Sequence, residues 1–233
     1  AFAEAQIPGL SDPALQPKFM NLVPDALAPG CKILTPNSND RKKTVFAGPS
    51  VQQTGLVDGS GNLLDTHVWG YGMDSWKSGI PTWPGPTIEA KSKQKVDIKW
   101  ENRLYPDIVD NHLLPVDISL HWAYSLPGYT AYNIPDHGVP IVTHVHGGHS
   151  DFQFDGNPEF FFSPGFEIKG PQFVDKTYKY DNSQGAGNLW YHDHALGITR
   201  LNVYAGLAGF YFLRDKDDTG DTKNKLNLPA WPY

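Results

Sequence analysis

Two histidine pairs in this sequence have the residue types and the spacing that could bind a transition metal. One residue separates His144 from His146, and one separates His192 from His194. Each pair lies among β-branched or aromatic residues, and side chains two positions apart on a strand point to the same face of a sheet. Two such strands side by side would bring four imidazoles into one small volume. Imidazole suits copper, zinc, iron and nickel, so the pattern predicts a metal site.

The combination of two pairs is more specific than either pair alone. A single pair arises readily by chance, and a lone histidine is more often a hydrogen-bonded structural residue. Here both pairs end strand-like segments, and both are followed by small residues that let other groups approach: Gly147, Gly148 and Ala195. His149 is given no role. Four histidines have no partner at this spacing and are interpreted as loop or surface residues: His67, His112, His121 and His137.

The elements that must position these pairs are predicted to be mostly β-strands. The sequence has 20 prolines, 23 glycines and 13% aromatic residues but only 19% charged residues, which is typical of many short strands and turns. Apolar and polar residues alternate from Val96 to Glu101, which predicts a half-buried strand. Strands are also predicted after Thr44 and at 68–71, and a rigid turn at 83–88 leads into another strand. Further along the chain, the predicted elements are strands at 139–146, 177–180 and 188–194, a turn at 183–187 joining the last two, an aromatic loop at 150–170, a short helix at 195–202 and a closing strand at 203–213.

Composition shifts predict three parts in the chain. Residues 1–40 are rich in proline and read as an extended arm on a domain surface. Residues 41–215 carry the strand patterns and form the predicted domain. Residues 216–233 turn polar and then proline-rich, as expected for a linker toward a next domain.

Charge and hydrophobicity exclude some partners. A net charge of −6, with no run rich in Lys or Arg, argues against a nucleic-acid-binding surface. No apolar stretch approaches the ~18 to 20 residues of a membrane span. The single cysteine, Cys31, cannot form an internal disulfide. The chain starts with Ala1, which is compatible with a removed export signal, so we expect a secreted, periplasmic or spore- or cell-surface location.

The motifs around the histidines resemble those of the multicopper oxidases, and within them the bacterial spore-coat laccase and bilirubin oxidase group. The most specific run is Trp190-Tyr191-His192-Asp193-His194-Ala195, followed by residues 199–206. The resemblance extends from about residue 69 to residue 215 and includes residues 86–88, 143–148 and 155–156. It implies an all-β fold, a cupredoxin-like sandwich of two packed sheets with Greek-key connections.

The resemblance also implies copper as the cofactor. In this family a type 1 copper accepts electrons singly, and a trinuclear cluster shared by two domains passes four electrons to dioxygen. By position, His144 is similar to a type 2 copper ligand, and His146, His192 and His194 are similar to ligands of the type 3 pair. The implied reaction reduces dioxygen to water while a small aromatic reductant is oxidised: a phenol, an aromatic amine or a bilirubin-like pigment.

Three charged residues near the pairs have more than one interpretation. Asp155 matches an acidic position near the cluster in relatives, where a carboxylate could manage protons, but Asp-Gly is also an ordinary turn. Asp193 lies between two histidines and should point away from them, so it is expected to support ligands rather than bind metal. Arg200 is expected to anchor the helix by pairing with a carboxylate.

The sequence lacks sites that a complete multicopper oxidase carries. Four further cluster histidines and a type 1 site with a cysteine flanked by histidine are missing, because Cys31 has Gly30 and Lys32 as neighbours. The chain therefore resembles the N-terminal part of a larger oxidase. Alone it should be inactive and bind copper weakly. Its expected partners are the C-terminal domains of the same oxidase, in the same chain or as a separate cleaved chain.

Three rival functions remain open from the sequence. The run from His144 to His149 approximates the zinc-binding run of metallo-β-lactamase folds, but Gly148 stands where an Asp ligand should be. A non-enzymatic structural or coat domain would keep the same histidines. A metal-ion oxidase would need an acidic or Met-rich patch, and the two methionines, Met20 and Met73, do not form one in the sequence.

Overall fold

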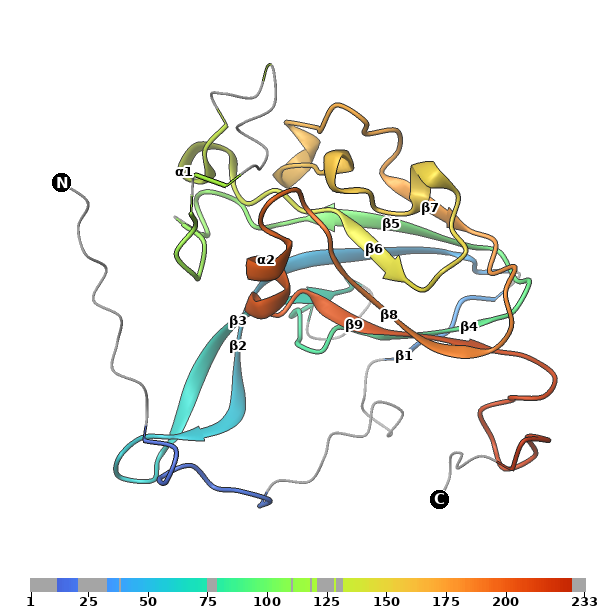
Figure 1. The fold of residues 1–233 in the computed structure, drawn as a ribbon, viewed down its shortest axis with the longest axis horizontal. Helices are drawn as coiled ribbons and strands as arrows, with labels where there is room; N and C mark the ends of the chain where they lie inside the picture. The colour runs from blue at the N-terminus through green and yellow to red at the C-terminus, as the bar shows by residue number, and fades with distance from the viewer. Residues whose placement is uncertain are drawn as a thin grey trace.

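The fold is a sandwich of two β-sheets, as predicted from the sequence (Figure 1). The computed structural model describes residues 12–20, 33–37, 39–74, 79–109, 111–117, 119–120, 128 and 132–227. Cys31 and His121 lie outside the described residues. No helix within the described ranges has the length and apolar character of a membrane span.

The first sheet has four strands in the order β3-β2-β5-β7. The strands are β2 (Lys42–Val57), β3 (Leu63–Gly72), β5 (Val96–Asn102) and β7 (Thr177–Tyr180). β2 pairs with β3 antiparallel and with β5 parallel, and β5 pairs with β7 antiparallel. The predicted alternation of β5 holds with one exception. Asp97 is buried, and its carboxylate lies 3.1 Å from Arg41 Nε, which compensates the buried charge.

The second sheet has five strands in the order β1-β4-β9-β8-β6. The strands are β1 (Ile33–Leu34), β4 (Thr87–Lys91), β6 (Thr143–His146), β8 (Gly187–Asp193) and β9 (Ala208–Arg214). β4 pairs in parallel with β1 and β9, whereas β8 pairs antiparallel with β9 and β6. From β3 to β8 the strands alternate between the two sheets along the chain, so each connection crosses from one sheet to the other.

Large aromatic residues fill the core between the sheets. The rings of Tyr71, Trp100 and Tyr191 are buried and lie 5.1 to 5.6 Å apart, in edge-on and tilted arrangements that suit aromatic packing. Their polar atoms are satisfied. Trp100 Nε1–H donates to Tyr180 Oη at 3.1 Å, and the Tyr191 hydroxyl donates to the Pro86 carbonyl at 2.7 Å. Tyr191 therefore anchors β8 in the core from the face opposite to the histidines.

Several of the predicted elements differ from the structure. The closing strand predicted at 203–213 begins only at Ala208, as β9, because residues up to Ala205 belong to a helix. The turn at 183–187 does not close a hairpin, because β7 pairs with β5 in one sheet while β8 lies in the other. The predicted strand at 139–146 shortens to β6, since Ile141 instead forms an isolated bridge with Phe162. The aromatic loop contains three 3-10 turns: η2 (Phe152–Phe154), η3 (Pro158–Phe160) and η4 (Pro164–Phe166).

The helices are short and lie near one end of the second sheet (Figure 1). They are α1 (Ile134–His137) and α2 (Thr199–Ala205). The predicted helix after the second histidine pair exists but begins at Thr199, after Gly197 has taken a positive φ of 77°. α2 ends at Gly206, whose φ is 126° and where a Cβ would lie 2.1 Å from the Trp69 carbonyl oxygen. Only glycine allows that approach.

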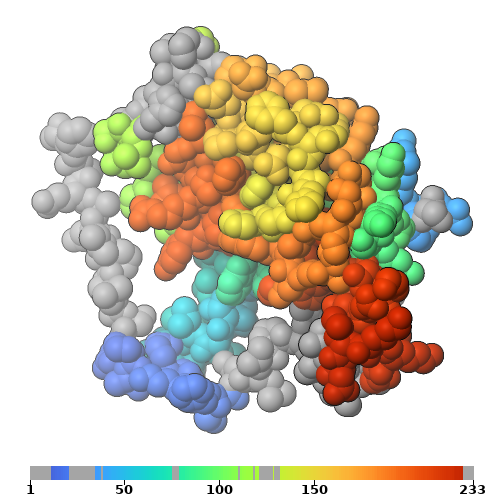
Figure 2. Space-filling view, turned by 45° about the vertical axis from the view of Figure 1, so that its right-hand side comes forward, coloured from blue at the N-terminus to red at the C-terminus, as the bar shows by residue number. Residues whose placement is uncertain are grey.

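The outer halves of β2 and β3 extend as a hairpin beyond the rest of the first sheet (Figure 1). Residues 12–20 lie beside this hairpin in both views (Figures 1 and 2). Gln16 fixes the contact, because its side-chain amide donates to the Val57 carbonyl and accepts from the Val57 N–H, each at 3.0 Å. Residues 12–20 are otherwise exposed, and Ile33–Leu34 joins the second sheet as β1.

Candidate metal centre

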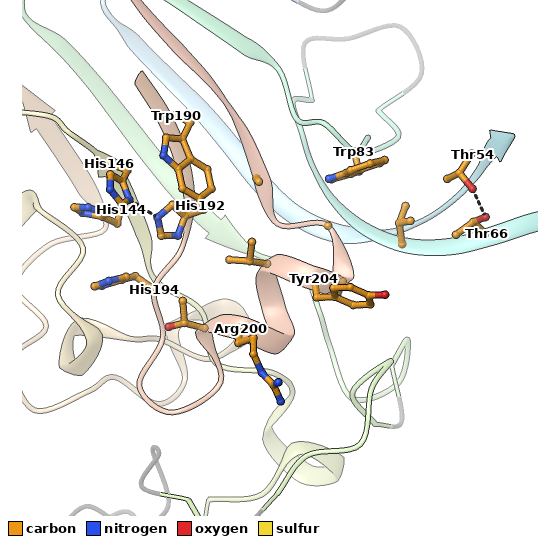
Figure 3. A pocket seen from close by; sticks show the side chains of 16 residues that line it. Thr54, Thr66, Trp83, His144, His146, Trp190, His192, His194, Arg200 and Tyr204 are labelled. Carbon is orange, nitrogen blue, oxygen red and sulfur yellow. Dashed lines mark hydrogen bonds between the residues drawn. The ribbon is translucent and has the colours of Figure 1, made fainter. Parts of the chain in front are cut away.

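The two histidine pairs lie next to each other because β6 and β8 are neighbouring antiparallel strands. In their register His144 is opposite His192, and His146 is opposite Trp190. His194 directly follows β8, and its backbone N–H donates to the Val142 carbonyl at 2.7 Å, just before β6 begins. The four imidazoles therefore lie on one face of the sheet edge (Figure 3).

The imidazoles are close enough to share metal ions. One ring nitrogen from each of His144, His146 and His192 lies within 4.8 Å of the others. His194 is the fourth member, with its ring stacked on His144 at 4.9 Å between centroids and 5.8 Å from the His192 ring. The structure therefore brings together all four histidines of the predicted site.

Backbone carbonyls orient three of the four rings. His144 Nδ1 forms a short hydrogen bond with the Asp155 carbonyl, His192 Nδ1 bonds the Asp193 carbonyl at 2.6 Å, and His194 Nδ1 bonds the Gly156 carbonyl at 3.0 Å. A carbonyl can only accept, so each Nδ1 carries the proton and each Nε2 keeps its lone pair. Anchoring of one ring nitrogen while the other stays free is the usual arrangement of metal-binding histidines.

His146 is held differently. Its Nδ1 lies 3.2 Å from His192 Nε2, so two ring nitrogens face each other. Its ring stacks on Trp190 at 5.2 Å with an interplanar angle of 22°, and Trp190 also packs on His192 at 4.2 Å. Trp190 thus fixes both rings from one side. The geometry offers Nδ1 of His146, rather than Nε2, to the shared volume.

Burial keeps the second pair neutral. Desolvation, followed by the neighbouring histidines, lowers the pKa of His192 to about 4. Desolvation and the charge of His144 also lower the pKa of His194, against smaller opposing contributions from the Gly156 carbonyl and Asp155. A neutral imidazole is the form that binds a metal ion. Both groups therefore have the protonation state that metal binding requires.

Asp155 and Gly156 lie directly against the first pair. Asp155 caps η2, and its carboxylate oxygen is 3.5 Å from His144 Nδ1 with 35% of the side chain exposed. Gly156 has a φ of 74°, and a Cβ there would lie 2.2 Å from the Thr143 carbonyl oxygen. The Asp-Gly turn is therefore structural, because its two carbonyls orient His144 and His194. Its carboxylate also lies within reach of the imidazoles.

Asp193 points away from the imidazoles, as predicted from strand alternation. Its carboxylate is fully buried and accepts the N–H groups of Val142 and Ala195, each at 3.0 Å, and the Asn202 side-chain amide at 2.9 Å. Burial raises its pKa to about 7, against the lowering effect of these donors. Asp193 supports the backbone that carries the histidines.

Sequence reasoning missed two polar residues behind the site. His112, interpreted as a loop or surface histidine, lies in a loop but is buried, and its Nε2 is 2.9 Å from the Asn202 side-chain oxygen. Desolvation lowers its pKa. Asn202 is fully buried on α2. A buried Asn in a helix is unfavourable without partners, and Asn202 within the predicted helix was the signal that could have revealed these two residues.

Arg200 is exposed and forms no ion pair within the described ranges, so the expected carboxylate pair is not found.

A groove of about 930 Å³ opens from the histidine cluster (Figure 3). The cluster and Trp190 lie at one end, and Trp83, Tyr204 and the outer hairpin line the rest. Tyr204 is 81% exposed and Trp83 is 43% exposed. Exposed aromatic residues in a concave surface are typical of binding sites for other molecules or domains.

The chain is similar in sequence to multicopper oxidases and to proteins named laccase. Residues 131–218 match the model of the family described as multicopper oxidase. The laccase of Bacillus subtilis is 40% identical over 172 residues, which cover 74% of this chain and 29% of that laccase. The laccase of Bacillus stratosphericus is 47% identical over 150 residues, 64% of this chain and 26% of its own length.

Solved structures agree on the fold. A multicopper oxidase from Campylobacter jejuni, described as a metallo-oxidase, is 20% identical and has a TM-score of 0.54 over 88% of this chain and 31% of its own. This likeness concerns the cupredoxin-like sandwich itself. The chain spans less than a third of the length of each of these relatives.

Proposed function

Because this chain belongs to the multicopper oxidase family, we propose that its four clustered histidines bind copper as half of a trinuclear centre. The observation that carries the proposal is the convergence of these imidazoles from β6 and β8 with three of them anchored through Nδ1. His144, His192 and His194 offer Nε2, and His146 offers Nδ1. Neutral imidazoles suit copper in both of its common oxidation states.

When bound, the copper centre supplies the electron transfer that reduces dioxygen to water, and the residues of this chain prepare the site. The three carbonyls hold their imidazoles with the lone pairs inward, so little reorganisation accompanies metal binding. Trp190 covers one side of two rings and limits water there. Asp155 is placed beside His144, where its partly exposed carboxylate can pass protons between solvent and the reacting oxygen atoms.

The remaining ligands come from further domains of the same oxidase, seated in the groove. All four histidines line one end of that groove. The aromatic residues Tyr204 and Trp83 would provide apolar anchors for the partner domain. We propose residues 41–215 as the first domain, with 1–40 as its arm and 216–233 as the linker to the next domain. The chain alone would bind copper weakly and be inactive.

The activity of the whole protein is proposed to be laccase-like oxidation of phenols, aromatic amines or bilirubin-like pigments. The relatives named laccase support this assignment. Oxidation of metal ions is the alternative activity, and the two methionines of the chain, Met20 and Met73, do not form a Met-rich patch in the sequence. We further propose a secreted, periplasmic or spore- or cell-surface location.

Copper binding to the purified chain tests the proposal. We expect Cu(I) to bind, and His144→Ala and His192→Ala each to weaken binding by at least tenfold. His149→Ala is the matched control, because His149 is exposed and close in sequence but outside the cluster. Equal copper binding in all three variants and the parent would contradict the site. Selective binding of zinc by the chain would instead favour the metallohydrolase. A structural role would be favoured if the complete protein held copper but consumed no oxygen with a phenol as reductant.

A further inference from the structure

We infer that His112 and Asn202 are positioning residues for the second histidine pair, acting through the buried carboxylate of Asp193. The side chains of His112, Asn202 and Asp193 all lie outside the space between the four imidazoles, where metal is proposed to bind. They form a line of hydrogen bonds from the loop at 111–117, through α2, to the end of β8. The inference deepens the proposed copper site and rests on it for its functional meaning.

Asp193 is the junction between the two histidine pairs. Its Oδ1 accepts the Val142 N–H at 3.0 Å, immediately before β6, and its Oδ2 accepts the Ala195 N–H at 3.0 Å, immediately after His194. Its backbone carbonyl accepts Nδ1–H of His192 at 2.6 Å. One residue therefore fixes the start of the first pair's strand, the ring of His192 and the turn that carries His194.

Asn202 holds the Asp193 carboxylate in place. Its side-chain Nδ2 donates to Asp193 Oδ2 at 2.9 Å and to the Pro140 carbonyl at 3.1 Å. The amide must face this way for both bonds to form, because the opposite orientation would point its oxygen at two acceptors. In a fully buried position the lost bonds would not be replaced by water.

His112 supplies the donor for the other end of the Asn202 amide. Nδ1 of His112 accepts the Leu114 N–H at 3.0 Å, so the ring proton must lie on Nε2. Nε2 then donates to Asn202 Oδ1 at 2.9 Å and leaves Nδ2 directed at Asp193. Trp69 packs on the His112 ring at 4.4 Å and keeps it from rotating. The donors and acceptors thus run in one direction from Leu114 to Asp193.

Loss of the His112 donor should therefore loosen the second pair without removing a ligand. The Asn202 side-chain oxygen then lacks a donor in a buried position, and the amide is held only by its two bonds to Asp193 and Pro140. Any shift of Asn202 that relieves this weakens its bond to Asp193, and the His194 turn and the His192 ring are then held less firmly. Removing groups that orient metal-binding histidines costs about 10- to 100-fold in metal affinity. A role in stability alone would lower the melting temperature and leave the imidazoles as they are.

The test combines nitrogen-detected NMR of the imidazoles in the copper-free chain with Cu(I) affinity. His112→Phe removes both hydrogen bonds at similar volume, whereas His112→Gln retains a donor toward Asn202. Ile98→Ala is the control, because Ile98 is fully buried in the other sheet and its truncation lowers stability without removing any of these hydrogen bonds. The parent chain should show the Nε2–H tautomer for His112.

We expect His112→Phe to broaden or shift the ring-nitrogen signals of His192 and His194 and to weaken Cu(I) binding about tenfold. His112→Gln should restore most of both, and Ile98→Ala should change neither. Unchanged ring signals in His112→Phe, or the opposite tautomer of His112 in the parent, would overturn the inference. The tautomer needs no variant, so it decides even if His112→Phe does not fold. Failure of the parent to bind copper would instead overturn the proposed function, and the ring signals would still decide the positioning role.

Discussion

Gly156→Ala should damage the metal centre more than its small size suggests. Gly156 has a φ of 74°, a conformation that costs an L-residue about 1–2 kcal/mol. The new Cβ would also lie 2.2 Å from the Thr143 carbonyl oxygen and 2.8 Å from the His144 Cα. Both contacts are with backbone, so β6 or the turn must move. That movement acts directly on the strand that carries the first histidine pair.

Both effects contribute to the expected loss of stability. Forcing extra volume into a packed site costs about 1–3 kcal/mol, so together with the backbone strain we expect a loss of about 2–5 kcal/mol. For a domain of this size the melting temperature should fall by about 5–15 °C. Because the Gly156 carbonyl also orients His194, Cu(I) affinity should fall by about tenfold or more.

Gly61→Ala isolates the backbone strain. Gly61 has a φ of 83°, and nothing lies within 4 Å of the position of a Cβ there. Thermal unfolding should therefore show a loss of only about 1–2 kcal/mol, and Cu(I) affinity should be unchanged. The reasoning would be refuted if Gly156→Ala were no less stable than Gly61→Ala, or if it bound copper as tightly as the parent.

Three further predictions address pH, the groove and Asp155. Burial lowers the pKa of His112, so the unfolded chain binds that proton more tightly, and the free energy of unfolding should fall as the pH drops below about 6.5. His112→Gln should remove part of this slope in urea titrations of the copper-free chain. Tyr204→Ala should weaken association with the partner domains by about 2 kcal/mol, because Tyr204 is an exposed aromatic residue in the groove. The complete oxidase should then retain less copper and consume less oxygen, while the stability of this chain alone should not change. Asp155→Asn should lower oxygen reduction by the complete protein about a hundredfold and leave its copper content intact; equal turnover would show that Asp155 is only a turn residue.

The convergence of the four histidines could be predicted because strand periodicity is a local property. The spacing of His144 and His146, repeated at His192 and His194, required only that two strands be neighbours, and β6 and β8 are. The same alternation predicted that Asp193 points away from the imidazoles. Composition correctly predicted a mostly β structure, and the family resemblance correctly implied a sandwich of two sheets.

Long-range pairing could not be read from local patterns. The turn at 183–187 looked like a hairpin, but the partner of β7 is β5, about 80 residues earlier in the chain. His112 lacks any neighbouring motif, and its partner Asn202 is 90 residues away. Such contacts depend on how the sheets and α2 pack, which the residue spacing does not encode.

The most direct test of the central claim is nitrogen-detected NMR of the histidine rings during Cu(I) titration of the chain. The account predicts that Nε2 of His144, His192 and His194 and Nδ1 of His146 respond to the metal, while the exposed His67 and His149 do not. Response of other histidines in place of these four, or no response of any ring nitrogen, would contradict a copper site formed by β6 and β8.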